Sequence, residues 1–197
     1  KVPPFAREAY AHFNLSPDKP VVLAVGGSLG ARTINNSLMA DLNKFTNAGV
    51  QVLWQTGKLQ YDSIHEALAG EHMEDIHYMK FIRRMDYAFS VANIVVSRAG
   101  ASTISELCLV KKPAIFVPSP NVAEDHQRKN ALALTKIHAA HMVEDSEAQG
   151  KLAEECLKLL QDKKRQENYA ENIEKMARPD AANQIVDEII KIIQADD

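Results

Sequence analysis

The chain has 197 residues, a hydrophobic content of 46% and a formal net charge of −3. This length suits one domain with a sizeable core, and the composition is that of an ordinary globular protein. A sequence-independent grip on nucleic acid needs a basic face, and the acidic balance without a long run of Lys or Arg argues against one. We therefore expect no nucleic-acid partner.

The sequence holds no stretch of the ~20 apolar residues that a membrane-spanning helix requires. It opens with Lys1-Val2-Pro3-Pro4, which is neither a signal peptide nor a normal start, so we expect a segment cut from a longer protein. The two cysteines, Cys108 and Cys156, lie far apart in helical patterns. They suggest neither a disulfide framework nor a metal site, and a reducing cytosol is the expected compartment. No cofactor or divalent metal is implied.

Short apolar runs alternate with amphipathic stretches over most of the chain. This alternation is typical of βα units around a parallel sheet. We therefore predict an α/β fold, a Rossmann-like parallel sheet with helices on both faces. The predicted strands are Val21–Gly26, Val50–Gln55, Ile76–Phe81, Ile94–Ser97, Ala114–Pro118 and His141–Val143.

Three of the intervening segments carry apolar residues at helical spacing, which predicts one buried stripe on each helix. The third of these helices is expected from about Asp125 to Ile137. The stripe residues are Ile34, Leu38, Leu42 and Phe45 in the first, Ile104, Leu107 and Cys108 in the second, and Ala131, Leu134 and Ile137 in the third.

After Val143 the chain is helical to its end, with a break at Arg178-Pro179-Asp180. Asp180 is placed to cap a last helix, whose wide apolar face packs either on this domain or on a missing one. We predict a single domain over residues 1–197, with a lead-in from a missing N-terminal domain at 1–19, a βα core at 20–145 and C-terminal helices at 146–197. The apolar face comprises Ala182, Ile185, Val186, Ile189, Ile190 and Ile193.

Two loops at the ends of predicted strands are rich in small residues. The first strand runs into Gly26-Gly27-Ser28-Leu29-Gly30-Ala31, and the fourth into Arg98-Ala99-Gly100-Ala101-Ser102-Thr103, each followed by a helix. Amides at a helix N-terminus attract phosphate, and glycine allows close approach. Both loops would open into one crevice, where Ser28, Ser102 and Thr103 would add hydroxyls. The alternative for the first loop is a tight turn without a ligand. It is neither the dinucleotide fingerprint nor a P-loop.

Polar residues follow in positions that suit a sugar nucleotide. Glu106 lies one turn beyond Ser102 and would accept the hydroxyls of a ribose, unless it is only a solvated surface residue. Gln127 offers both a donor and an acceptor for sugar hydroxyls, and His126 would do the same or merely cap its helix. No pair of nucleophile and base stands out, so no catalytic residue is assigned.

Taken together, these motifs resemble those of the MurG-type peptidoglycan N-acetylglucosaminyltransferases. The resemblance extends from about Pro20 to the last helix. It implies the GT-B architecture of two Rossmann-like domains, of which this chain matches the C-terminal, donor-binding half. The motifs that carry it are Gly26-Gly27-Ser28-Leu29-Gly30-Ala31-Arg32, Phe81-Ile82, Ser97-Arg98-Ala99-Gly100-Ala101-Ser102-Thr103-Ile104-Ser105-Glu106 and His126-Gln127-Arg128-Lys129-Asn130-Ala131.

The resemblance also implies a binding site for UDP-GlcNAc. In some relatives a second Gln stands where this sequence has His126. The implied contacts are the diphosphate for Gly27, Ser28 and Gly30, the uracil for Phe81 and the backbone of Ile82, the phosphate and sugar for Ala101, Ser102 and Thr103, the ribose for Glu106, and the GlcNAc hydroxyls for His126 and Gln127.

By the same resemblance, the whole enzyme would transfer GlcNAc from UDP-GlcNAc to lipid I with inversion, forming lipid II for peptidoglycan. The acceptor site and general base would lie in the N-terminal half, so this chain alone would bind the donor without transferring it. The whole protein would lie on the cytoplasmic face of the inner membrane. Alternatives are the donor half of another UDP-sugar GT-B enzyme, such as a glycolipid glycosyltransferase or an epimerase, or a non-catalytic nucleotide-binding or interaction module.

Overall fold

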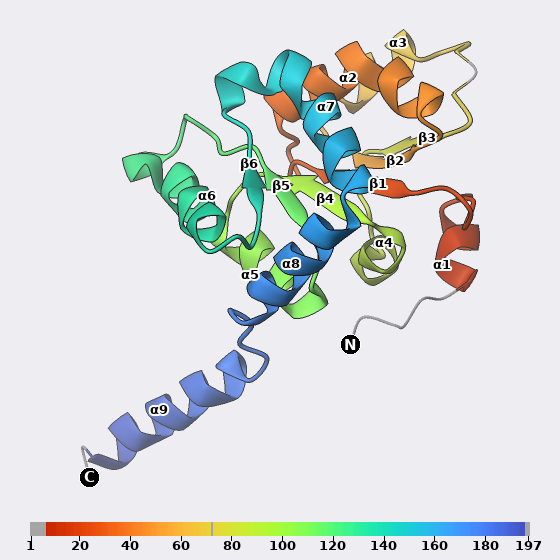
Figure 1. The fold of residues 1–197 in the computed structure, drawn as a ribbon. Coiled ribbons are helices and arrows are strands. Elements are labelled where there is room, and N and C mark those ends of the chain that lie inside the picture. The colour runs from red at the N-terminus through yellow and green to blue at the C-terminus, as the bar shows by residue number, and fades with distance from the viewer. Residues whose placement is uncertain (1–6, 72, 196–197) are drawn as a thin grey trace.

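The computed structural model describes residues 7–71 and 73–195, so residues 1–6 of the predicted lead-in lie outside the described residues. Six parallel strands form one sheet in the order β3-β2-β1-β4-β5-β6 (Figure 1). All six predicted strands are confirmed, and each lies inside its predicted range. Their bounds are Val21–Val25 (β1), Gln51–Gln55 (β2), Ile76–Met79 (β3), Ile94–Ser97 (β4), Ala114–Phe116 (β5) and His141–Met142 (β6).

The central strands are buried on both faces, which explains why they appear in the sequence as apolar runs. Successive side chains of a strand point to opposite faces. In β1, Val22 and Ala24 enter the core on one side of the sheet, and Val21, Leu23 and Val25 enter the core on the other.

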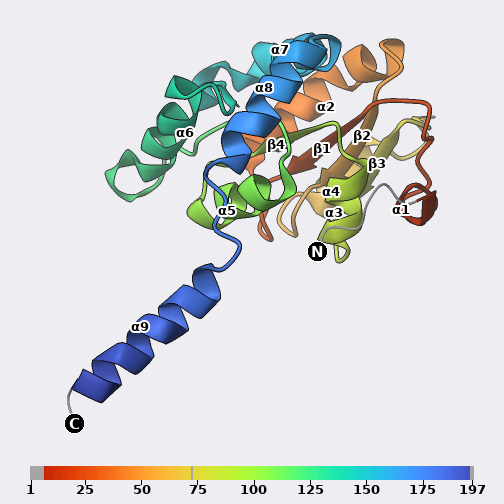
Figure 2. The same cartoon turned by 60° about the horizontal axis from the view of Figure 1, so that its bottom comes forward.

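Helices cover both faces of the sheet (Figures 1 and 2), as predicted for a Rossmann-like α/β domain. The eighth helix, α8 (Lys163–Glu174), places Tyr169 in one core and Ile173 in the other. One layer holds α2 (Arg32–Asn47), α3 (Tyr61–Ala67) and α7 (Ala148–Gln161), and the other holds α1 (Arg7–His12), α4 (Met85–Val91), α5 (Ala101–Val110) and α6 (His126–Lys136). Two short 3₁₀ turns, η1 (Ala123–Asp125) and η2 (Asp145–Glu147), precede α6 and α7.

The predicted apolar stripes of α2, α5 and α6 face the core, with one exception. Ile104 is partly buried and the other stripe residues are buried, except for Ile137. Ile137 is 47% exposed, so its prediction as a core residue was wrong. The helix ends at Lys136, so Ile137 lies just beyond its last turn, and the next residue, His138, adopts a left-handed conformation with φ 53°.

Both ends of the described chain are helical, and they pack differently. Near the start, Ala9 and Phe13 are buried in the same core as α4, so this part of the predicted lead-in packs into the domain. The last helix, α9 (Ala181–Ala195), begins directly after Asp180 and extends away from the body of the domain (Figures 1 and 2). The large apolar side chains from Ile185 to Ile193 are 45–63% exposed and do not pack on the domain.

Two further sequence expectations concern cysteines and membrane spans. Cys108 and Cys156 are both free and buried, in α5 and α7 respectively. Among the residues that the structure describes, no helix has the length and apolar character to cross a membrane.

Candidate functional site

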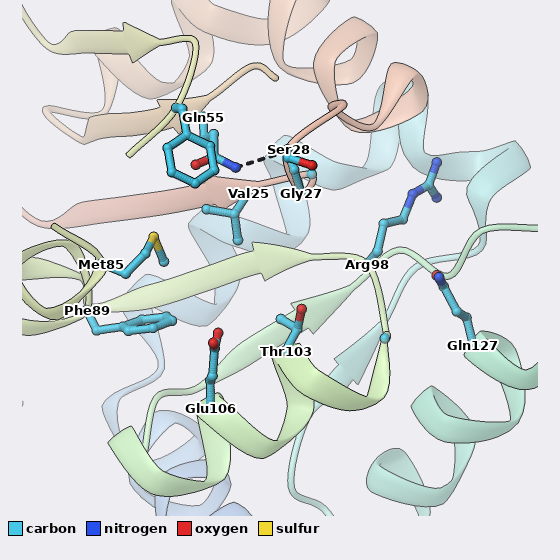
Figure 3. Close-up of a pocket in the computed structure, with 13 residues that line it drawn as sticks. Val25, Gly27, Ser28, Gln55, Met85, Phe89, Arg98, Thr103, Glu106 and Gln127 are labelled. Atoms are coloured by element: carbon cyan, nitrogen blue, oxygen red, sulfur yellow. Dashed lines mark hydrogen bonds between the residues drawn. The ribbon is translucent and has the colours of Figure 1, made fainter. Parts of the chain in front are cut away.

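The two central strands, β1 and β4, are neighbours whose following strands lie on opposite sides of them. Val25 pairs with Ser97, so the loops after β1 and β4 begin at the same level. Open α/β sheets bind their ligands at such a switch point, beyond the carboxyl ends of the strands. A hollow of about 430 Å³ lies there, and residues of both loops line it (Figure 3).

One wall of the hollow is the glycine-rich loop after β1. Gly27 and Gly30 adopt positive φ values of 81° and 92°, which glycine tolerates without strain. The loop rests on the turn after β2, where the Lys58 amide donates to the Ser28 carbonyl at 3.1 Å. A Cβ on Gly30 would lie 2.2 Å from the Thr56 carbonyl oxygen, so glycine is also required for this close packing.

A buried polar network holds the turn after β2 in place. The Asn35 Nδ2 donates to the Thr56 carbonyl at 2.8 Å, and its Oδ1 accepts from the Trp54 indole N–H at 2.9 Å. Asn35 and Trp54 are both buried, and buried polar groups are stable when they are hydrogen-bonded in this way. The glycine-rich loop therefore rests on a rigid support.

A glutamine in the floor of the hollow joins two loops. Gln55 ends β2 and is 5% exposed. Its Nε2 donates to the Gly27 carbonyl at 2.9 Å, as Figure 3 shows, and its Oε1 accepts from the Ile82 amide at 2.8 Å. Gln55 was not predicted as a site residue. The available signal was a polar residue at the end of an otherwise apolar strand.

The opposite wall is the beginning of α5. Thr103 and Glu106 line the hollow, and Figure 3 shows both side chains directed into it. They are three residues apart and therefore share one face of the helix. Ala101 and Ser102 are exposed in the first turn of α5 and are not among the residues that line the hollow. Thr103 therefore joins Glu106 in the lining, and the phosphate and sugar contacts of Ala101 and Ser102 stay predictions.

Apolar side chains close the end of the hollow next to the loop after β3. Phe81 lies at the rim and is 55% exposed, while Met85 and Phe89 of α4 line the hollow beside it. Ile82 is buried in the core, and its amide is bonded to Gln55. Met85 and Phe89 were not predicted, because apolar residues on a helix ordinarily indicate core positions.

A second hollow of about 520 Å³ adjoins the first, and Arg98 lines both. The Arg98 guanidinium donates to the Val117 carbonyl at 2.9 Å and also to the Asp145 carboxylate. Asp145 in turn accepts from the Thr33 hydroxyl at 3.0 Å. Arg98 appeared in a motif without a role, and Asp145 was not predicted at all, because no local pattern connects residues this far apart in sequence.

The three remaining predicted site residues lie at or near this junction. Gln127 lines both hollows, and its Oε1 accepts from the Ser119 amide at 2.9 Å, which fixes the side chain there. Gly30 lines the second hollow. His126 is exposed and belongs to neither lining, and its Nδ1 contacts the Ala123 carbonyl at 2.8 Å. In this conformation His126 supports the start of α6.

The hollow therefore offers different chemistry along its length. Backbone amides and the Thr103 hydroxyl stand near the two loops, the Glu106 carboxylate follows, and apolar side chains stand at the far end. This order suits a ligand that carries a phosphate group, hydroxyls and a flat ring. Within the described residues, no group of three or more His, Cys, Asp or Glu side chains is arranged to hold a metal ion.

The chain is similar in sequence to known glycosyltransferases over most of its length. Residues 21–185 match the glycosyltransferase family 28 C-terminal domain. The UDP-N-acetylglucosamine--N-acetylmuramyl-(pentapeptide) pyrophosphoryl-undecaprenol N-acetylglucosamine transferase of Parabacteroides distasonis is 53% identical, over 94% of this chain and 50% of its own length. The Christiangramia forsetii protein of the same name is 46% identical, over 98% of this chain and 52% of its own length. The chain thus spans about half the length of the curated relatives that it matches.

Solved structures give the same picture of the fold. Acinetobacter baumannii MurG superposes with a TM-score of 0.77 and 31% identity, over 93% of this chain and 53% of that chain. S. aureus MnaA, in a structure with UDP, gives a TM-score of 0.71 at 11% identity, over 96% of this chain and 50% of that chain. This likeness shows a shared fold alone. These matches confirm the predicted fold class, the C-terminal half of a GT-B glycosyltransferase. The chain therefore belongs to glycosyltransferase family 28, as a C-terminal domain whose relatives are MurG-type N-acetylglucosaminyltransferases.

Proposed function

We propose that this chain binds UDP-GlcNAc, as the donor half of a MurG-type N-acetylglucosaminyltransferase. The observation that carries the proposal is the hollow at the switch point of the sheet. It brings the Ser28 loop and Thr103 together where the diphosphate would lie, and it places Glu106 beside them where the ribose would follow.

The diphosphate would lie between the glycine-rich loop and the N-terminus of α5. Among the described residues, the amides of Ser28 and Leu29 donate to no acceptor of the chain. The N-terminus of α5 adds its own amides and the positive end of its dipole. The predicted contacts of Gly27, Ser28, Ala101 and Ser102 belong to this part of the proposal.

The uridine would extend from there toward α4. Glu106 directs its carboxylate into the hollow, where it would accept hydrogen bonds from both ribose hydroxyls. Phe81, Met85 and Phe89 would contact the flat uracil ring. Because the Ile82 amide is already bonded to Gln55, a uracil contact by Ile82 would have to use its carbonyl.

The GlcNAc would lie toward the junction of the two hollows. Gln127 and Arg98 line both, and Gln127 would read the sugar hydroxyls with its amide nitrogen, because its oxygen is taken by Ser119. His126 remains a predicted sugar contact, and its ring would first have to leave the Ala123 carbonyl.

In the whole protein, a hydroxyl of lipid I would attack the anomeric carbon of GlcNAc. The bond from that carbon to the diphosphate oxygen would break, and UDP would leave with inversion at the carbon. The loop amides and the N-terminus of α5 would stabilise the negative charge that grows on the diphosphate. The acceptor site and general base would lie in the half that this chain does not span, and the whole protein would work on the cytoplasmic face of the inner membrane.

The proposal is tested by calorimetric titration of the chain with UDP-GlcNAc, UDP-GalNAc and UDP, together with a transfer assay on a lipid I analogue. We expect one UDP-GlcNAc per chain, bound more tightly than UDP-GalNAc, and no transfer. Lack of UDP-GlcNAc binding by the folded chain would contradict the donor site. Transfer by the chain alone would contradict the assignment of the base to the other half.

A further inference from the structure

We infer that Gln55 is a positioning residue that sets the spacing between the loop for the diphosphate and the loop for the uracil. The inference rests on the proposed function, because it assigns the two loops to two parts of one ligand. It concerns a residue that contacts both loops and that lies beneath the ligand.

The place of Gln55 in the sheet explains how one side chain reaches both loops. Strand β2 lies between β1 and β3. Gln55 is its last residue, while Gly27 and Ile82 belong to the loops that follow β1 and β3. The side chain therefore stands at the carboxyl end of the middle strand and bonds to the loop on each side, to Gly27 at 2.9 Å and to Ile82 at 2.8 Å.

The residue type is the one that this bridge requires. One partner is a carbonyl, which needs a donor, and the other is an N–H, which needs an acceptor. A primary amide supplies both from one planar group. A glutamate could accept from Ile82 and could not donate to Gly27, and an apolar residue could do neither. At 5% exposure, water has little access to replace either bond.

The bridge matters for a ligand that must touch both loops at once. In UDP-GlcNAc, the ribose links the uracil to the diphosphate and limits the distance between them. When the loops already stand at that distance, binding does not have to order them, and the affinity is higher. Without the bridge, each loop keeps its own contacts while their spacing varies. A ligand that spans both loops then loses affinity, and uridine alone loses little.

The same strand provides a matched control. Gln51, at the other end of β2, is also buried, accepts from the Ser16 amide at 2.7 Å and donates to the carbonyls of Ser16 at 2.8 Å and Lys19 at 3.3 Å. Gln51 and Gln55 thus share residue type, strand, burial and a side chain that both accepts from and donates to the backbone. Only Gln55 lines the hollow.

The experiment compares the 197-residue chain with its Gln55→Met and Gln51→Met variants, after thermal unfolding has shown that each is folded. UDP-GlcNAc is titrated by calorimetry and uridine by NMR. We expect Gln55→Met to weaken UDP-GlcNAc roughly tenfold, because binding then has to order the two loops, and uridine by less than about threefold. Gln51→Met should change both by less than about threefold.

Equal weakening of uridine and UDP-GlcNAc by Gln55→Met, or equal effects of the two variants, would overturn the inference. If Gln55→Met does not fold, Gln55→Asn takes its place, because its shorter amide reaches one loop at a time, and the same split between ligands is expected. A wild-type chain that binds UDP-GlcNAc while the Gln55 variants bind it equally well overturns only this inference. A wild-type chain that binds no UDP-GlcNAc overturns the proposed function.

Discussion

Gly57 and Gly30 lie back to back, so that a Cβ on Gly57 would stand 2.1 Å from the Gly30 nitrogen. Both have positive φ, 76° and 92°. The contact presses the turn after β2 against the loop that forms one wall of the hollow. The shape of the proposed phosphate loop therefore depends on a residue of another loop.

Replacing Gly57 with Ala should displace the glycine-rich loop. We expect at least a roughly tenfold loss of UDP-GlcNAc affinity, because the Gly30 backbone has to move away from the new methyl group. Gly70→Ala is the matched control, since Gly70 has φ 86° and no atom within 4 Å of its Cβ position. The control should cost only the strain of a left-handed residue, about 1–2 kcal/mol in urea unfolding, and leave affinity unchanged. Equal effects of the two variants on affinity would contradict the role of the contact.

The ribose contact of Glu106 predicts a specific loss of discrimination. Glu106→Ala should weaken UDP about 10- to 100-fold, as for a hydrogen bond to a charged group. In the wild type, 2′-deoxy-UDP should bind less tightly than UDP, and in the variant the two should bind equally. Ser105→Ala, on another face of α5, serves as the control and should keep the preference for UDP. A preference that persists in Glu106→Ala would show that another group reads the 2′-hydroxyl.

Asp145 is expected to stabilise the fold more than an ordinary surface carboxylate. Its side chain is 21% exposed, and it accepts hydrogen bonds from Arg98 in the loop after β4 and from Thr33 in α2. Asp145→Ala leaves the half-buried guanidinium without its counter-charge, and should lower the free energy of unfolding by about 2 kcal/mol. Glu147→Ala, which breaks an exposed pair with Lys151, should cost at most about 0.5 kcal/mol. Urea unfolding measures the free energy of unfolding of both variants. Equal losses in the two would refute the structural role of Asp145.

Stability should fall as the pH drops below the ordinary histidine pKa of 6.5. Burial lowers the pKa of His77, and the negative charge of Asp75 only partly offsets this shift. Burial also lowers the pKa of His141. The positive charge of Arg165 lowers this pKa further, and the negative charge of Glu155 opposes the shift. The unfolded chain therefore takes up protons that the folded chain excludes, so stability is full above pH 6.5 and is lost as the pH falls through the folded pKa values.

This linkage is measured by urea unfolding between pH 8 and pH 5. His77→Gln removes one of the two groups, so its free energy of unfolding should decline less steeply with falling pH than that of the wild type. An unchanged slope would mean that His77 takes up its proton equally in the folded and unfolded states.

Most of the fold could be predicted from the sequence, because a central parallel sheet buries both faces of its strands. Each strand then stands out as an apolar run, and the α2 stripe from Ile34 to Phe45 fixes which face of that helix is buried. The error at Ile137 concerns a helix end, where periodicity gives no information about the left-handed turn at His138.

The site was predictable where its residues share one element. Helical spacing alone places Glu106 with the start of α5. Gln55 and Asp145 escaped prediction because their partners are far away in the sequence, and only the order of strands in the sheet brings Gln55 between Gly27 and Ile82. Arg98 likewise depends on Asp145, which reaches it from η2.

A crystal structure of the chain with UDP-GlcNAc tests the central claim most directly. We predict density in the hollow at the switch point, with the diphosphate between the Ser28 loop and α5, the ribose on Glu106, the uracil next to Phe81 and the sugar toward Gln127. Density for the nucleotide in another hollow, or with the ribose away from Glu106, would contradict the account.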